Sequence, residues 1–162
     1  MIKVLISDKL AQEGIDLLKS MGGVEPVVKT GLPEDELAKI IGEYDGLIIR
    51  SATQVTAKVL ANPGKLKAIA RAGVGIDNVD VPAATRKGII VMNTPGGNTL
   101  SAAEHTMAMM LALSRFIVPA CNSLKAGVWD KKSYTGNQLN NKVLGVIGLG
   151  RIGMAVAKMA RG

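Results

Sequence analysis

The feature that most constrains the fold of this chain is an alternation of short β-branched runs with helical patterns over its first 94 residues. Strands that alternate with helices in this way form a parallel sheet with helices on both faces. Five strands are expected at 3–7, 24–28, 46–50, 66–71 and 88–93, with helices at 11–21 and 33–42 and helical pieces near 56–61 and 81–87. We therefore predict an α/β fold, a flavodoxin-like doubly wound parallel sheet.

Several single residues refine this prediction. Pro26 cannot donate a backbone hydrogen bond, so it places the second strand at an edge of the sheet. A proline and acidic residues open segment 33–42 and a glycine closes it, which are helix start and stop signals. In segment 11–21, the side chains expected to face inward are Ile15, Leu17 and Leu18.

The chain changes character after residue 98. Segment 101–117 predicts one long helix that is apolar on nearly every side, so it should be buried on several faces. Ser101 and Glu104 have the spacing of a capping box at its start. Residues 118–142 are expected to be an irregular polar arm, with Trp129 and Tyr134 among lysines and asparagines. We expect a first domain over 1–98 and a second segment over 99–162.

A glycine-rich turn follows the arm in the stretch VLGVIGLGRIG, residues 143–153. A predicted strand, Val143 to Ile147, runs directly into Gly148-x-Gly150-x-x-Gly153, and a helical pattern leaves it. This is the context of a dinucleotide-binding fingerprint, in which the glycines permit a tight turn, close approach of a pyrophosphate and helix–strand packing. The alternative is a tight βα turn without a ligand. The acidic ribose-binding residue expected about 20 positions later lies beyond Gly162.

A second candidate site lies at the carboxyl ends of the predicted strands, where open parallel sheets bind ligands. Arg50, followed by Ser51, ends one strand, and Arg71 ends the next. Two guanidinium groups on one rim suit a ligand with carboxylate or phosphate groups. The backbone N–H groups around Gly73, Val74 and Gly75 are expected to form a second anion nest. The alternative is that both arginines are ordinary surface charges.

Other polar residues predict structure more than chemistry. Asp8 is expected to cap the helix that follows it, His105 to be structural, and Cys121 to be inert. No metal-ligand spacing is present in the sequence. The net charge of +7 is scattered, without the motifs or aromatic platforms of a nucleic-acid-binding protein. The lone cysteine fits a reducing compartment, and no apolar run is long enough to span a bilayer. We expect a soluble cytoplasmic protein.

Four stretches together resemble the NAD-dependent D-2-hydroxyacid dehydrogenases: LIIRSAT, IARAGVGIDNVD, AATRKGIIVMNTPGGNTLSAAEHT and NKVLGVIGLGRIG. They occur in the family's order, and the resemblance covers all 162 residues. GLGRIG is shared by the whole family, whereas RSAT with RAGVGIDNVD is specific for its phosphoglycerate branch. The resemblance implies a substrate-binding lobe over 1–98, then an interdomain helix, a dimerisation arm and the start of a Rossmann NAD-binding domain. It also implies NAD-dependent oxidation of 3-phosphoglycerate in serine biosynthesis.

The resemblance also assigns roles to individual residues. Arg50 and Arg71 would hold the substrate phosphate, and the backbone from Gly73 to Gly75 its carboxylate. Val74 would also touch the nicotinamide. Further candidates are Ser51, Asn98 and Lys131 at the substrate, where relatives carry arginine in place of Lys131, and Arg151 and Ile152 at the cofactor diphosphate.

The family's catalytic arginine, glutamate and histidine would all come later, so no residue of this chain is predicted to be catalytic. The resemblance thus implies an N-terminal part of a longer enzyme, inactive alone and forming homo-oligomers through residues 99–162. Two alternatives come from other classes of protein: a non-catalytic dehydrogenase-like corepressor or nucleotide sensor, and a flavodoxin-like mononucleotide-binding module. A third is another D-2-hydroxyacid dehydrogenase. The Arg50 and Arg71 pair favours a small dianionic substrate.

Overall fold

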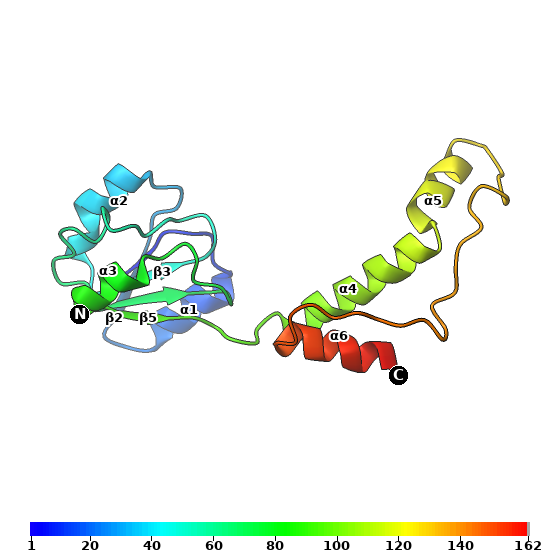
Figure 1. Cartoon of the computed structure of the whole chain (residues 1–162). Helices are drawn as coiled ribbons and strands as arrows, with labels where there is room; N and C mark the ends of the chain where they lie inside the picture. The colour runs from blue at the N-terminus through cyan, green and yellow to red at the C-terminus, as the bar shows by residue number, and fades with distance from the viewer. Residues whose placement is uncertain (162) are drawn as a thin grey trace. The chain divides into compact units, whose positions relative to one another are not determined.

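The computed structural model describes residues 1–161, which divide into two compact units, Met1–Gly97 and a second that begins at Asn98 (Figure 1). The first unit contains a five-stranded sheet in the order β2-β1-β3-β4-β5, with every pair of neighbours parallel. This is the flavodoxin-like strand order, so the predicted fold class is confirmed. The strands are β1 Ile2–Ile6, β2 Val24–Val28, β3 Gly46–Ile49, β4 Ala68–Arg71 and β5 Ile90–Met92.

Strand β2 lies at one edge of the sheet, as Pro26 predicts. Pro26 is level with Val4 of β1. An edge strand tolerates proline because one row of its backbone groups has no neighbour to bond.

Three α-helices belong to the first unit: α1 Gln12–Ser20, α2 Glu34–Ile40 and α3 Val81–Arg86, with a 3-10 turn at Ile41–Glu43 after α2. The predictions for 11–21, 33–42 and 81–87 are therefore confirmed to within a few residues. The expected inward position of Leu17 is wrong, because its side chain is 64% exposed. Ile15 and Leu18 are half-buried, so the buried stripe of α1 is narrower than predicted.

The predicted helical piece near 56–61 is also wrong, because only an isolated turn forms there. Val55 is held by backbone bonds of 2.8 Å to both Asn78 and Asp80, and Pro63 follows closely. A turn confined between these points has no room to propagate, because helix growth needs several residues beyond the nucleus.

The hydrophobic core of the first unit joins one face of the sheet to α2, α3 and the segment between β3 and β4. Helix α3 begins with a side-chain cap, in which Asp80 accepts a hydrogen bond from the Ala83 N–H at 2.9 Å. The largest fully buried side chains of this core are Leu5, Leu37, Ile41, Leu47, Ile49, Val55, Val59, Leu60 and Ile69. This core fixes the ends of β1, β3 and β4, from which the candidate site is built.

The second unit contains α4 Thr99–Ser114, α5 Ile117–Lys125 and α6 Arg151–Arg161. One helix over 101–117 was expected, and this is wrong. Phe116 adopts a left-handed φ of 52° and the axis bends by 63°. The expectation that 118–142 is irregular is therefore wrong over α5.

Helix α4 differs from its prediction in two further ways. It begins at Thr99, two residues early, so Ser101 donates to the Asn98 carbonyl at 3.1 Å and no capping box forms. Within the described residues, Ala103 is its one buried side chain, so the predicted burial on several faces is wrong here. Among the described helices, none alone is long and apolar enough to cross a membrane, and α4 with α5 meets that criterion only as a bent pair.

The predicted strand from Val143 to Ile147 is not a strand in the structure. Val143 and Ile147 are fully exposed, at 99% and 105%. A strand is defined by its ladder of hydrogen bonds to a neighbour. Within residues 1–161, no segment pairs with this one.

Candidate functional site

The first candidate site lies where the strand order of the first unit reverses, between β1 and β3. Ligands of doubly wound sheets bind beyond the carboxyl ends of the strands at such a switch point. Three segments leave the sheet at this edge: Ser7 and Asp8 after β1, the turn Arg50–Thr53 after β3, and residues 72–75 after β4. We call this edge the rim.

Asp8 organises the rim from inside the protein. Its side chain is buried, with the residue 6% exposed, and one carboxylate oxygen accepts hydrogen bonds from the backbone N–H of Arg50 at 2.6 Å and of Thr53 at 3.1 Å. The other oxygen accepts the Thr53 hydroxyl at 2.8 Å. The prediction that Asp8 caps a helix is wrong, because Ala11 occupies the N-cap of α1. Sequence neighbours suggested a local bond, whereas the real partners lie more than 40 residues away.

Asn78 holds the same turn from the opposite side, and sequence reasoning missed it. Its amide donates to the carbonyl of Arg50 and to the carbonyl of Thr53, each at 2.7 Å. The residue is 5% exposed. Its position within the motif IARAGVGIDNVD was the only signal that could have identified it.

The two rim arginines differ in what their guanidinium groups already contact. The exposed Arg50 makes one long bond, 3.3 Å, to the carbonyl of Lys9. The half-buried Arg71 donates to its own loop, at 2.6 Å to the Gly75 carbonyl, and to the Arg50 carbonyl at 3.3 Å. A guanidinium has five N–H donors, so both retain donors for an anion. Arg71 also acts as a strut between two rim segments.

In the loop after β4, the strut leaves little room for a side chain at Gly73, and Asp77 leaves little at Gly75. Gly73 and Gly75 have ordinary backbone angles for any residue, because neither has a positive φ. A Cβ on Gly73 would lie 2.7 Å from Nη1 of Arg71. Behind the loop, Thr94 donates through its N–H and its hydroxyl to the Gly73 carbonyl, and Asn93 donates to the Val74 carbonyl at 2.6 Å.

The structure qualifies the predicted anion nest. The N–H of Gly73 donates to the Arg71 carbonyl at 2.9 Å, so it is already engaged. Ser51 is exposed in the turn Arg50–Thr53. The structure thus brings Arg50, Ser51, Arg71 and the 73–75 loop to one edge of the sheet, whereas Asn98 and Lys131 belong to the second unit.

The second candidate site is the glycine turn at the start of α6. Gly148 has a φ of +90°, which only glycine adopts freely. A Cβ on Gly153 would come within 2.2 Å of the Gly148 carbonyl, so the helix packs directly on the turn. Nothing lies within 4 Å of where a Cβ on Gly150 would be. Arg151 and Ile152 open the helix, whose first N–H groups have no partner inside it.

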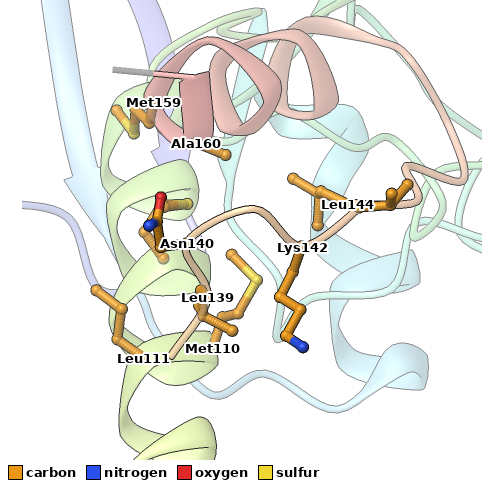
Figure 2. A pocket seen from close by; sticks show the side chains of 10 residues that line it. Met110, Leu111, Leu139, Asn140, Lys142, Leu144, Met159 and Ala160 are labelled. Atoms are coloured by element: carbon orange, nitrogen blue, oxygen red, sulfur yellow. The ribbon is translucent and has the colours of Figure 1, made fainter. Parts of the chain in front are cut away.

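An apolar pocket of about 300 Å³ lies inside the second unit between α4, α6 and the segment 139–144 (Figure 2). Met110 and Leu111 of α4 and Leu144 line it, with Met159 from α6. A second cavity of about 310 Å³ lies beside the glycine turn and is lined by Val146, Ile152 and Val156 among others. Both linings combine apolar side chains with polar groups, such as Asn140 and Lys142 in the first and Thr106 in the second.

The remaining predicted residues lie apart from these sites. Lys131 sits 5.6 Å from the ring centre of Trp129, a cation–π contact on the arm. Beside it, the Ser133 hydroxyl, together with the backbone N–H groups of Ser133 and Lys132, lowers the pKa of Asp130. His105 is exposed on α4, so its expected place in a buried helix is wrong, and Cys121 is exposed and unbridged. Residues 1–161 hold no cluster of metal-ligating side chains.

Comparison with known families decides the class of protein. The family model described as "D-isomer specific 2-hydroxyacid dehydrogenase, catalytic domain" matches residues 4–143. The chain belongs to this family. The matched residues include the rim, whereas the glycine turn lies beyond them.

Individual relatives narrow the comparison. The chain is 53% identical over 161 residues to a protein named D-3-phosphoglycerate dehydrogenase from Synechocystis, covering 99% of this chain and 29% of that protein. The chain thus spans about three tenths of the length of such curated relatives.

Solved structures agree with this assignment. The TT0316 protein of Thermus thermophilus matches with a TM-score of 0.89 and 36% identity, over 99% of this chain and 53% of that one. An NAD⁺-bound 3-phosphoglycerate dehydrogenase of Entamoeba histolytica matches with a TM-score of 0.77 and 28% identity. This match covers 99% of this chain and 50% of that one.

Proposed function

We propose that this chain supplies the substrate-binding lobe and the cofactor phosphate turn of an NAD-dependent D-3-phosphoglycerate dehydrogenase. The enzyme oxidises 3-phospho-D-glycerate to 3-phosphooxypyruvate, the first step of L-serine biosynthesis, in the cytoplasm. The observation that carries the proposal is the exposed guanidinium of Arg50 at the switch point, which among residues 1–161 makes one long hydrogen bond, to the Lys9 carbonyl. The names of the relatives support the choice of substrate.

The substrate carries a carboxylate at one end and a phosphate at the other. Arg50 binds the phosphate through charge-assisted hydrogen bonds, because its donors point to no other strong acceptor. Arg71 contributes the donors that its strut leaves free. The N–H groups of Val74 and Gly75 bind the carboxylate, and Ser51 borders the substrate.

The residues of the glycine turn fit the diphosphate of NAD. The open space at Gly150 leaves room for it, and the N–H groups at the start of α6 would stabilise its negative charge. Arg151 and Ile152 open that helix and would contact the diphosphate. When bound, NAD supplies the acceptor for the hydride that leaves C2 of the substrate.

The proposal is tested by titrating the 162-residue chain with 3-phosphoglycerate and with D-glycerate, which lacks the phosphate. Arg50→Ala should weaken binding of 3-phosphoglycerate about ten- to a hundredfold, which is what the loss of about 1.5–3 kcal/mol produces. Binding of D-glycerate should change little. Arg86→Ala is the matched control, because Arg86 is an exposed arginine at the end of α3, away from the rim. An equal loss for both ligands would show that Arg50 does not bind the phosphate.

A further inference from the structure

The turn that carries Arg50 is gripped at both ends by the same two side chains. Asp8 accepts the backbone N–H of Arg50 and that of Thr53. Asn78 donates to the backbone carbonyl of Arg50 and to that of Thr53. Ser51 and Ala52, between these ends, are exposed. A four-residue turn is thus fixed by two buried residues, one from the loop after β1 and one from the loop after β4.

We propose that Asp8 and Asn78 are positioning residues, which fix the backbone at Arg50 so that its guanidinium is presented to an anion at the rim. This inference rests on the proposed function. A loop that is already ordered loses less conformational entropy when a ligand binds, so affinity rises without a new contact. Neither residue needs to touch the ligand, because each acts through the backbone of Arg50.

The chemistry of the two side chains supports positioning more than direct binding. A carboxylate beside an anion site is unfavourable unless its charge is used elsewhere. The Asp8 carboxylate already accepts hydrogen bonds from two backbone N–H groups and from the Thr53 hydroxyl. The Ser7 hydroxyl lies 2.9 Å from the Thr53 hydroxyl oxygen. The Thr53 hydroxyl donates its hydrogen bond to Asp8, so its oxygen accepts one from the Ser7 hydroxyl. The three side chains form a buried chain of hydrogen bonds.

Asn78 makes the complementary point. Its Oδ1 atom is buried without a donor among the described residues. An unmatched buried carbonyl costs stability, and a smaller apolar residue would avoid that cost. This cost is offset by the two hydrogen bonds that the Asn78 amide donates to the carbonyls of the turn.

The test uses the 162-residue chain and compares wild type with Asp8→Asn, Asn78→Ala and the milder Thr53→Val, which removes only the hydroxyl. Each variant is titrated with 3-phosphoglycerate, and hydrogen exchange is measured at the Arg50 and Thr53 amides. Asp8→Asn should raise the Kd about tenfold and reduce the protection of both amides, because a neutral amide oxygen accepts their hydrogen bonds more weakly than a carboxylate does. Asp16→Asn is the control, because Asp16 is an exposed carboxylate on α1.

A double variant separates positioning from general destabilisation. In the Arg50→Ala background, Asp8→Asn should weaken binding no further, because the group that it positions is gone. An additive loss of affinity in the double variant overturns the positioning role. So does an Asp8→Asn variant whose Arg50 and Thr53 amides lose protection while its affinity for 3-phosphoglycerate is unchanged. If Asp8→Asn does not fold, Thr53→Val with the same readouts decides. If wild type binds no 3-phosphoglycerate, the proposed function fails first, and protection of the two amides still tests the grip on the turn.

Discussion

Replacing Gly73 by alanine is expected to weaken 3-phosphoglycerate binding by displacing the guanidinium of Arg71. The backbone at Gly73 has no positive φ, so alanine is compatible with it. The new methyl group would stand 2.7 Å from Nη1 of Arg71, closer than real Cβ atoms approach, and at a tight 3.2 Å from Cζ. Because the guanidinium is the flexible end of its side chain, it moves and its 2.6 Å bond to the Gly75 carbonyl breaks.

The size of the effect follows from that bond. A charge-assisted bond at a partly exposed site contributes about 1 kcal/mol. Its loss should lower the melting temperature of the first unit by about 4–8 °C. Affinity for 3-phosphoglycerate should fall about fivefold if Arg71 also binds the ligand. Thermal unfolding and calorimetric titration measure the two quantities.

Controls make this prediction decisive. Gly97→Ala should change neither quantity, because its methyl group would meet no atom closer than 3.5 Å. If Gly73→Ala acts through Arg71, the Arg71→Ala/Gly73→Ala double variant should match Arg71→Ala alone. Additive losses would refute the mechanism and show that Gly73 matters for another reason.

Three further predictions concern the second unit and the whole chain. The chain should self-associate through the part beyond residue 98, because Val143 and Ile147 are fully exposed and Leu113 is largely exposed; light scattering that shows a monomer at tens of micromolar (roughly the range where exposed apolar segments associate) would contradict this. The 162-residue chain alone should produce no NADH from 3-phosphoglycerate, since its single histidine lies exposed on α4; measurable turnover by a homogeneous sample would refute the assignment of no catalytic residue. Gly153→Ala should displace α6 from the glycine turn, because the new methyl group would lie 2.2 Å from the Gly148 carbonyl. Hydrogen exchange over 151–161 should then accelerate. Gly145→Ala is the control and should leave exchange unchanged, because there is open space around that position.

The sequence was sufficient for the features of the fold that depend on local pattern. The alternation of runs predicts five parallel strands, Pro26 predicts the edge, and the arginines at two strand ends predict the rim. Failures occur where long-range contacts decide. Asp8 and Asn78 bond to a turn more than 20 residues away in sequence, and no periodicity reports such a partner.

The errors in the second unit have a related cause. The apolar run from 101 onward contains no glycine or internal proline before the break, so its pattern does not show that Phe116 turns left-handed. A β-branched stretch such as 143–147 is predicted as a strand from its composition, but pairing depends on a neighbour. Propensity describes a residue's preference, and a tertiary contact decides whether that preference is realised.

The turn between Arg50 and Thr53 also bears on how ligand preference can evolve. Asp8 and Asn78 fix only its two ends, and Ser51 and Ala52 contribute no side chain to the core. These two positions can therefore accept new side chains without loss of the scaffold beneath them. A library that varies residues 51 and 52 alone would sample different ligand charges and sizes at constant stability, which makes this turn a natural starting point for redesigning specificity.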